Sequence, residues 1–298
     1  MSFTAADVKN LREKTGCGMM DCKKALTETN GDFDKAMDFL REKGLATAEK
    51  KAGRIASEGM VDILVEGNVA AMVEVNSETD FVAKNAEFQE LVKNIAKQVI
   101  ETNPADVDAL LASKFVGNES VTIKDMLTEK IAKIGENMNL RRFARFEGNV
   151  VDYIHMGGRI GVMVKVEGDI SSDEAREAAR DAAMQIAAMN PAYLDKTTVP
   201  EEDVEKEKHF ILAQMKEDPK NANKPDNILE KMLMGKINKF YEQNCLNQQE
   251  FVKDSNFKVE KYLASKGVKI VDFVRFEKGE GLEKKSEDFA AEVASMMK

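Results

Sequence analysis

The first 55 residues carry apolar positions at three- and four-residue spacings, a pattern that predicts short amphipathic helices. We expect helices over residues 4–15, 19–29 and 34–43. Gly44 would end the third helix, because glycine readily adopts the left-handed conformation of a helix end. Residues 46–54 would then form a short basic linker. The predicted core of the three helices consists of Val8, Leu11, Leu26, Ala36, Phe39 and Leu40.

Apolar runs after the linker predict two β-hairpins. In residues 61–75 the runs flank a glycine-containing turn at residues 66–68, which is a hairpin signal. Residues 151–166 follow the same pattern, and a helical pattern comes after each hairpin. Each unit then ends in nearly the same text, F-A-R-F-E at residues 143–147 and F-V-R-F-E at residues 273–277. The pattern therefore predicts an internal repeat of two related units.

The second unit is longer than the first by about 40 residues, and the extra sequence has a helical pattern of its own. Pro200 is expected to open a helix over residues 201–218, because proline fits the start of a helix. Two further prolines interrupt the pattern before a second helix over residues 226–243. The matching apolar spacing predicts an antiparallel helical hairpin that projects from the core, inserted at about residues 191–244.

Together these elements predict an α+β fold with antiparallel strands. The domains would be an N-terminal module with its linker at residues 1–55, a first core subdomain at 56–147 and a second at 148–279. Residues 280–298 carry apolar positions at helical spacing and would form a C-terminal helix that docks on some surface.

The composition restricts the classes of protein that fit the sequence. The chain has 298 residues, 43% of them hydrophobic and 33% charged, which is typical of a globular protein with more than one domain. No apolar stretch approaches the roughly 20 residues of a membrane span, and acidic residues near the N-terminus argue against a signal or transit peptide. We therefore expect a cytoplasmic protein that does not bind membranes. The net charge of −9 disfavours direct binding of nucleic acid.

The sequence lacks the motifs of common enzymes. It has no phosphate-binding loop, no H-E-x-x-H motif and no dinucleotide glycine fingerprint. The two histidines, His155 and His209, have no candidate nucleophile nearby in sequence. We expect no catalytic residue, no metal and no cofactor, and free thiols, buried or half-buried, at Cys17, Cys22 and Cys245.

The most informative segment is residues 74–84, E-V-N-S-E-T-D-F-V-A-K, a polar connection between a strand and an amphipathic helix. It places Phe81 directly after Asp80, and Thr79 could cap the helix that follows. Phe81 could be the first residue of the buried stripe of that helix. It could instead be an exposed wedge, because loops on rigid supports often carry binding residues. The rest of the stripe would comprise Phe88, Leu91, Val92, Ile95 and Val99.

A second candidate contact lies in the N-terminal module. Met19 and Met20 are neighbours in a predicted helix, where their side chains point about 100° apart, so we expect one of them to face outward. Lys23 would lie one turn away and give this apolar patch a basic rim. The alternative is that the methionines fill gaps in the core. In the basic linker, Lys51 could reach an acidic surface of a partner.

Three long stretches of the chain resemble one family. Residues 11–26 (L-R-E-K-T-G-C-G-M-M-D-C-K-K-A-L), 74–84 and 133–142 (K-I-G-E-N-M-N-L-R-R) are similar, in the same order, to motifs of bacterial elongation factor Ts. Similar sequence continues to F-V-R-F-E-K-G-E-G at residues 273–281, so the resemblance covers nearly the whole chain. It implies a non-enzymatic guanine-nucleotide exchange factor that binds elongation factor Tu, GDP-bound or nucleotide-free, in translation elongation.

The resemblance also implies roles for particular residues. A ubiquitin-associated-like fold is implied for the module. One segment would enter the G domain of elongation factor Tu and displace its Mg²⁺ ion; it comprises Thr79, Asp80, Phe81 and Val82. The module would contact the same domain through Arg12, Met19, Met20 and Lys23. His155, near the tip of the second hairpin, would also contact elongation factor Tu, although a histidine in a turn is usually a polar surface group.

Some alternatives stay open at the level of sequence. The helical hairpin could be a passive spacer, a docking arm or a dimer contact, and the family has a coiled coil in this region. Homodimerisation could use either the core or the hairpin. The alternative function is an adaptor whose N-terminal module binds a ubiquitin-like or ribosomal surface, and an enzyme of unknown type comes third.

Overall fold

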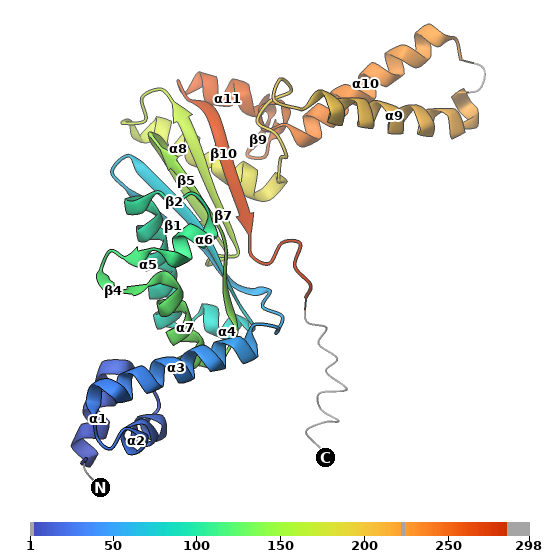
Figure 1. Ribbon diagram of the computed structural model, residues 1–298. Coiled ribbons are helices and arrows are strands. Elements are labelled where there is room, and N and C mark those ends of the chain that lie inside the picture. Colours follow the sequence, from blue (N-terminus) through green and yellow to red (C-terminus); the bar gives the residue numbers. More distant parts are fainter. Residues whose placement is uncertain (1–2, 222–223, 285–298) are drawn as a thin grey trace.

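The computed structural model describes residues 3–221 and 224–284, and it has the mixed α+β class predicted from the sequence. Figure 1 shows three parts: a helical module at the N-terminus, a central body of sheets and helices, and a helical hairpin that projects from the far end. The predicted C-terminal helix within residues 280–298 lies almost wholly outside the described residues.

The N-terminal module contains α1 (Ala5–Thr15), α2 (Met19–Glu28) and α3 (Phe33–Lys51). Thr4 and Asp7 form a capping box, in which each side chain bonds to the backbone N–H of the other residue. The start of α1 is therefore fixed by two reciprocal hydrogen bonds. As predicted, the buried core of the module includes Val8, Leu11, Leu26, Ala36 and Leu40, with Phe39 half-buried against it.

Gly44 does not end the third helix, and that prediction is wrong. α3 continues through Gly44 to Lys51, so most of the expected linker is helical. The reason is a crossing with α7 (Ile123–Ile134): Gly44 is buried, and a Cβ placed there would lie 3.6 Å from the Cβ of Ala132. Tertiary packing against α7 thus overrides the local tendency of glycine to end a helix.

The first sheet has the strand order β1 (Glu58–Glu66), β2 (Val69–Ser77), β5 (Met138–Glu147), all antiparallel. β1 and β2 form the predicted hairpin, and Gly67 in its turn adopts a φ of 61°. The outer face of the sheet packs against α5 (Ala86–Thr102) and α7. The largest side chains of this core include Phe88, Leu91, Ile95, Leu110, Ile123 and Met138.

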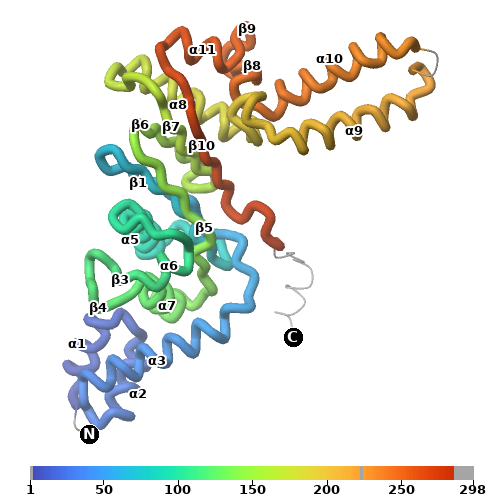
Figure 2. The backbone as a smooth tube through the Cα atoms, turned by 45° about the horizontal axis from the view of Figure 1, so that its top comes forward, coloured from blue at the N-terminus to red at the C-terminus, as the bar shows by residue number. Residues whose placement is uncertain are grey.

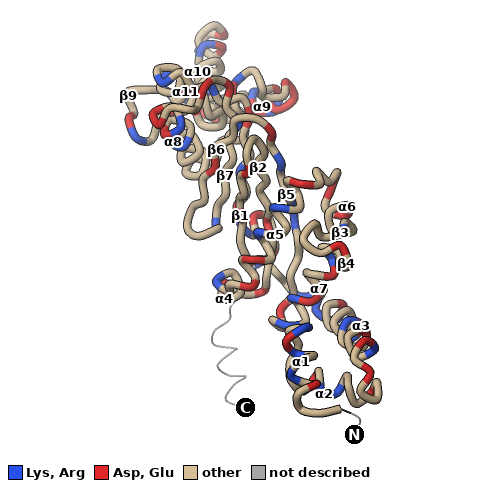
Figure 3. Tube along the Cα trace, turned by 90° about the vertical axis from the view of Figure 1, so that its left-hand side faces the viewer, with Lys and Arg blue, Asp and Glu red and all other residues tan. Residues whose placement is uncertain are grey.

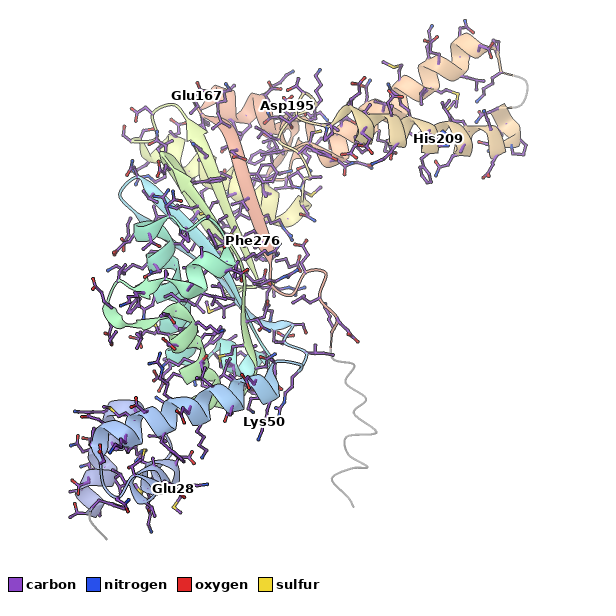
Figure 4. All side chains as sticks on the ribbon, in the orientation of Figure 1. Glu28, Lys50, Glu167, Asp195, His209 and Phe276 are labelled. Atoms are coloured by element: carbon purple, nitrogen blue, oxygen red, sulfur yellow. The ribbon has the colours of Figure 1, made fainter. Side chains whose placement is uncertain are left out.

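The second sheet repeats this arrangement with β6 (Asn149–His155), β7 (Ile160–Glu167) and β10 (Lys269–Glu277), in the order β10-β7-β6. Its outer face packs against α8 (Asp173–Met189) and α11 (Val259–Ser265). The inner faces of the two sheets meet in a small apolar cluster. Its buried members are Val61, Ala70, Met72, Met163 and Phe276, of which Figure 4 labels the last.

A short antiparallel hairpin precedes the last helix of each half of the body. In the first half it consists of β3 (Lys114–Phe115) and β4 (Asn118–Thr122), preceded by α6 (Val107–Ala112). In the second half it consists of β8 (Glu250–Phe251) and β9 (Asp254–Lys258). Both hairpins have the same two-pair register.

One buried glutamine holds each of these short hairpins to the long helix beside it. Gln98 on α5 donates to the carbonyl of Lys114 at 2.8 Å and accepts from the N–H of Val116 at 2.9 Å. Gln185 on α8 makes the same two bonds to the β8–β9 hairpin, at 3.1 and 2.9 Å. These bonds leave the buried amides satisfied and fix the hairpins in equivalent positions.

The projecting hairpin consists of α9 (Glu201–Glu217) and α10 (Asp226–Asn244), close to the ranges predicted from the sequence. Figure 2 shows the two helices running side by side away from the body. Figure 4 places His209 on α9, where it is exposed. The seam between the helices buries Ile211, Met215 and Ile237.

Charged residues of both signs occur throughout the described part of the chain. Figure 3 shows basic and acidic positions interspersed along the module, the body and the projecting hairpin.

All three cysteines are free, as predicted, with Cys17 half-buried and the other two buried. Burial raises the pKa of Cys245 to about 11, so this thiol stays protonated at neutral pH. Within the described part of the chain, no helix is long and apolar enough to cross a membrane.

Replacing Gly44 with alanine should stabilise the protein by about 0.5–1 kcal/mol, because glycine costs more backbone entropy in a helix interior. The added Cβ would meet Ala132 at 3.6 Å, an ordinary van der Waals distance. Chemical denaturation of Gly44→Ala beside the wild type measures the gain. A loss of stability would mean that the crossing of α3 and α7 needs a closer approach than an alanine permits.

Candidate partner-binding site

Phe81 is exposed: 77% of its surface is accessible, the highest value among the large apolar side chains in the described part of the chain. It lies in a separate short helix, α4 (Asp80–Ala83). Of the two alternatives for Phe81, the one that places it in the buried stripe of the following helix is therefore wrong. The helical conformation is interrupted at Lys84 and Asn85. The side chain of Asn85 then caps the start of α5 by accepting a hydrogen bond from the N–H of Glu87 at 2.8 Å.

The residues on either side of Phe81 hold it outward. Val82 is only 5% exposed and packs into the first core, so its neighbour in the helix points to another side. Asp80 accepts a hydrogen bond from Lys84 at 2.8 Å, and this bond holds the pKa of Asp80 below its ordinary value. The Lys84 ammonium lies 5.6 Å from the centre of the Phe81 ring. Phe81 is therefore exposed beside the charged groups of Asp80 and Lys84, while the adjacent Val82 is buried in the core.

The segment that leads into α4 is fixed by hydrogen bonds. Ser77 Oγ donates to the carbonyl of Thr79 at 2.9 Å. Thr79 donates its N–H and its hydroxyl to the two carboxylate oxygens of Glu136, at 3.0 and 2.7 Å. Glu78 accepts from the N–H of Asn137 at 2.6 Å. Thr79 does occupy the first position before α4, but its side chain does not cap that helix as predicted, because Glu136 takes the hydroxyl.

A fully buried carboxylate, Glu74, lies at the start of the same motif. It accepts from Arg142 Nε at 2.6 Å, from Arg141 Nη1 and Asn76 Nδ2 at 3.1 Å, and from the N–H of Gly279 at 2.9 Å. Burial alone would raise the pKa of Glu74, but the Gly279 N–H and the side-chain donors outweigh it and hold the pKa below its ordinary value. The network ties β2 to β5 and to the segment after β10.

His155 ends β6, and its Nδ1 lies 2.9 Å from the hydroxyl of Tyr153. The ring is half-buried, and the next residue, Met156, is 67% exposed in a left-handed conformation with a φ of 49°. The carbonyl of Gly158 accepts from the N–H of Val61 at 2.8 Å, which fixes this turn against β1. The turn therefore presents an exposed methionine next to the predicted histidine, on a backbone that is hydrogen-bonded to β1.

The turn that follows His155, residues 156–159 (the His155 turn), lies at the same end of the body as residues 79–82 (the Phe81 turn). Lys278 connects them: its N–H donates to the carbonyl of Arg159, and its ammonium pairs with Glu58 at the start of β1. Glu58 is in turn the strand partner of Ser77, which precedes the Phe81 turn. Sequence reasoning found His155 and Phe81 but missed Met156. An apolar residue beside two glycines in a hairpin turn was the signal available.

In the module, Met19 and Met20 are both exposed, at 54% and 73%. The sequence predicted one outward methionine, and the structure has two, because α2 is covered only on its opposite face. Arg12 and Lys23 are exposed as well. Met19 and Arg12 line a hollow of about 550 Å³ between the module and Lys133 on α7.

Lys51 is not free to extend into solvent. It is half-buried at the last position of α3, and its ammonium donates to the carbonyl of Gly135 just after α7. Because α3 runs on past Gly44, Lys51 reaches the carbonyl end of α7, where a positive charge is favourable. The structure therefore places this residue against the protein's own body.

Apolar side chains are exposed on turns that are hydrogen-bonded to the body. This arrangement is typical of a protein that acts by binding another protein. Residues 78–280 match the family Elongation factor TS. Elongation factor Ts of Clostridium tetani is 50% identical over 306 residues, covering 99% of each chain, and that of Clostridium kluyveri is 50% identical over 302 residues, covering 98% and 97%. The chain belongs to the elongation factor Ts family. It is a non-catalytic nucleotide exchange factor for elongation factor Tu in translation elongation, and family membership agrees with the cytoplasmic location expected from the sequence.

Replacing Glu74 with glutamine should destabilise the protein by about 3 kcal/mol at neutral pH, because two arginines would lose their buried carboxylate partner. A carboxyl group with a lowered pKa adds stability above its ordinary value of 4.5, and that contribution is lost as the pH falls below it. Urea denaturation at pH 7 and pH 4 checks both points. The difference between wild type and Glu74→Gln should shrink at the lower pH, whereas a constant difference would contradict the titration argument.

Proposed function

We propose that this chain promotes GDP release by inserting the Phe81 turn, residues 79–82, into the G domain of elongation factor Tu and disturbing the magnesium site there. The observation that carries the proposal is the exposure of Phe81 at 77% on a turn that is hydrogen-bonded to the body. An exposed aromatic residue held in this way has little conformational entropy to lose on binding.

Physical chemistry supplies the steps from insertion to release. A phenylalanine that becomes fully buried between packed helices gains roughly 1.5–3 kcal/mol from its apolar area. A close-packed domain accommodates such an insertion by shifting helices rather than by compressing. Magnesium requires nearly ideal octahedral geometry, so a small shift of its ligands weakens its binding and its hold on the phosphates. Asp80 and Thr79 would lie beside the inserted ring, while buried Val82 serves as its anchor.

Linkage limits how much one residue can do. Whatever factor the chain removes from GDP affinity, GDP removes from the affinity for the chain, and typical couplings are about 1–3 kcal/mol. Larger effects require further contacts that differ between the two states of the partner. In our proposal these come from Met19, Met20 and their basic neighbours in the module, and from His155 in the second turn. Lys51 would support the contact from within the body rather than touch the partner.

We also infer the finer organisation of the chain. The equal strand orders, the equal short-hairpin registers and the paired roles of Gln98 and Gln185 support two repeated subdomains at residues 56–147 and 148–279. The position of α9 and α10 between α8 and β8 supports an inserted hairpin in the second copy. A ubiquitin-associated-like fold of the module at residues 1–55, and homodimerisation through the body or the hairpin, stay predictions.

Phe81→Ala should lower the saturating rate of GDP release roughly 10- to 100-fold, which corresponds to the loss of about 1.5–3 kcal/mol of buried apolar area. The measurement is release of fluorescent GDP from the matching elongation factor Tu as the concentration of the exchange protein is raised. Because Phe81 is exposed in the free chain, its removal should leave the melting temperature nearly unchanged.

A matched control is Phe257→Ala, which removes another exposed phenylalanine, 43% accessible on β9. This variant should keep the wild-type rate. If Phe81→Ala also kept it while folding normally, insertion of Phe81 would not be the mechanism.

Removing magnesium should reduce the advantage of the wild type over Phe81→Ala. If the inserted ring acts by weakening the metal site, then chelation performs that step in advance and leaves less for Phe81 to contribute. GDP release is measured with both proteins in excess magnesium and in EDTA. An unchanged ratio of the two rates would separate the effect of Phe81 from the metal.

A further inference from the structure

We propose that Glu136 is a positioning residue for the Phe81 turn, which it holds in the shape that keeps the phenylalanine exposed. The inference rests on the function proposed above. Glu136 accepts from the N–H of Thr79 at 3.0 Å and from its hydroxyl at 2.7 Å, one bond to each carboxylate oxygen. A two-point grip on one residue restrains both the position and the rotation of the backbone just before α4.

α4 needs such a restraint because it has only four residues. A helix of this length does not form independently, since its nucleation is unfavourable and it gains few hydrogen bonds. The side chain of Thr79, which would ordinarily cap it, is bound to Glu136 instead. The turn is thus fixed on one side by Glu136 and on the other by buried Val82, with Asp80 and Phe81 between these two anchors.

Glu136 differs in its partners from Glu74 and Glu87, two other carboxylates of the body. Glu74 and Glu87 pair with arginine or lysine, whereas Glu136, among the described residues, makes no ion pair and spends both oxygens on Thr79. It also follows Gly135, whose carbonyl accepts from Lys51 at the end of α3. Two consecutive residues after α7, Gly135 and Glu136, therefore connect the end of that helix to α3 and to the Phe81 turn.

Glu136→Ala should lower the saturating rate of GDP release by about tenfold, because the module and the His155 turn would still hold the partner while the freed turn inserts Phe81 in only a fraction of the complexes. A merely structural defect would behave differently. If part of the protein were unfolded, the half-saturating concentration would rise while the saturating rate stayed at the wild-type value. Titrating elongation factor Tu loaded with fluorescent GDP against each variant separates these two parameters.

Two variants test the geometry directly. Glu136→Gln can still accept from the Thr79 N–H and donate to its hydroxyl, so it should recover most of the saturating rate. Thr79→Val removes only the hydroxyl and should show a smaller loss than Glu136→Ala. The control is Glu90→Ala, which removes an exposed carboxylate on α5 and should leave both parameters unchanged.

The decisive test combines Glu136→Ala with Phe81→Ala. If Glu136 acts through Phe81, the double variant should be no slower than Phe81→Ala alone. Additive losses would overturn the inference, because Glu136 would then act on the partner independently. A normal saturating rate for Glu136→Ala, while Phe81→Ala is slow, would overturn it and leave the proposed function intact. A normal rate for Phe81→Ala would instead remove the proposed function itself.

Discussion

The body depends on one buried carboxylate, Glu74, and on the four donors that surround it. A carboxylate removed from water is strongly unfavourable unless every oxygen is well hydrogen-bonded. Glu74 meets this condition only when β2, β5 and the segment after β10 are all in place, since its donors come from each of them. The apolar cluster between the two sheets is small, so this polar junction helps to specify how they fit together, along with the bond from Val61 to Gly158 and the ion pair of Lys278 with Glu58. It lies three residues before Ser77, where the strand ends and the Phe81 turn begins.

This placement explains how the chain can display an exposed aromatic ring. Every residue from Ser77 to Thr79 is bonded to the body, and Val82 is buried, so the order of the turn does not depend on Phe81. The residue at position 81 can therefore be determined by what its side chain contacts in a partner rather than by packing within this chain. The second exposed residue at this end, Met156, is held in the same manner by a turn pinned to β1. Because the backbone that carries these exposed apolar side chains is already fixed, little conformational entropy is lost when they bind a partner.

The sequence predicted elements whose signals are local, and it missed features set by distant contacts. Periodicity located the two long β-hairpins and the two helices of the projecting hairpin, because these depend on neighbours within a few residues. The passage of α3 through Gly44 depends on Ala132, which is far away in the chain. The break between α4 and α5 depends likewise on Glu136, which holds Thr79, and on Asn85, which starts a new helix. The motif around Phe81 could be recognised from its text, but the reason for its shape lies in residues 136 and 137.

The projecting hairpin joins the body at one point, where the chain enters and leaves it. The N–H groups of Ala192 and Tyr193 both donate to the carbonyl of Asn244, and Leu246 donates back to Tyr193. Gln185 on α8 makes the same bonds as Gln98 on α5, although α9 and α10 follow α8 whereas the short helix α6 follows α5. The hairpin beyond this base is held by a thin apolar seam and touches the body little. Energetic contributions from α9 and α10 should therefore add to those of the Phe81 turn rather than depend on them, because these two helices lie far from α4 (Figure 1).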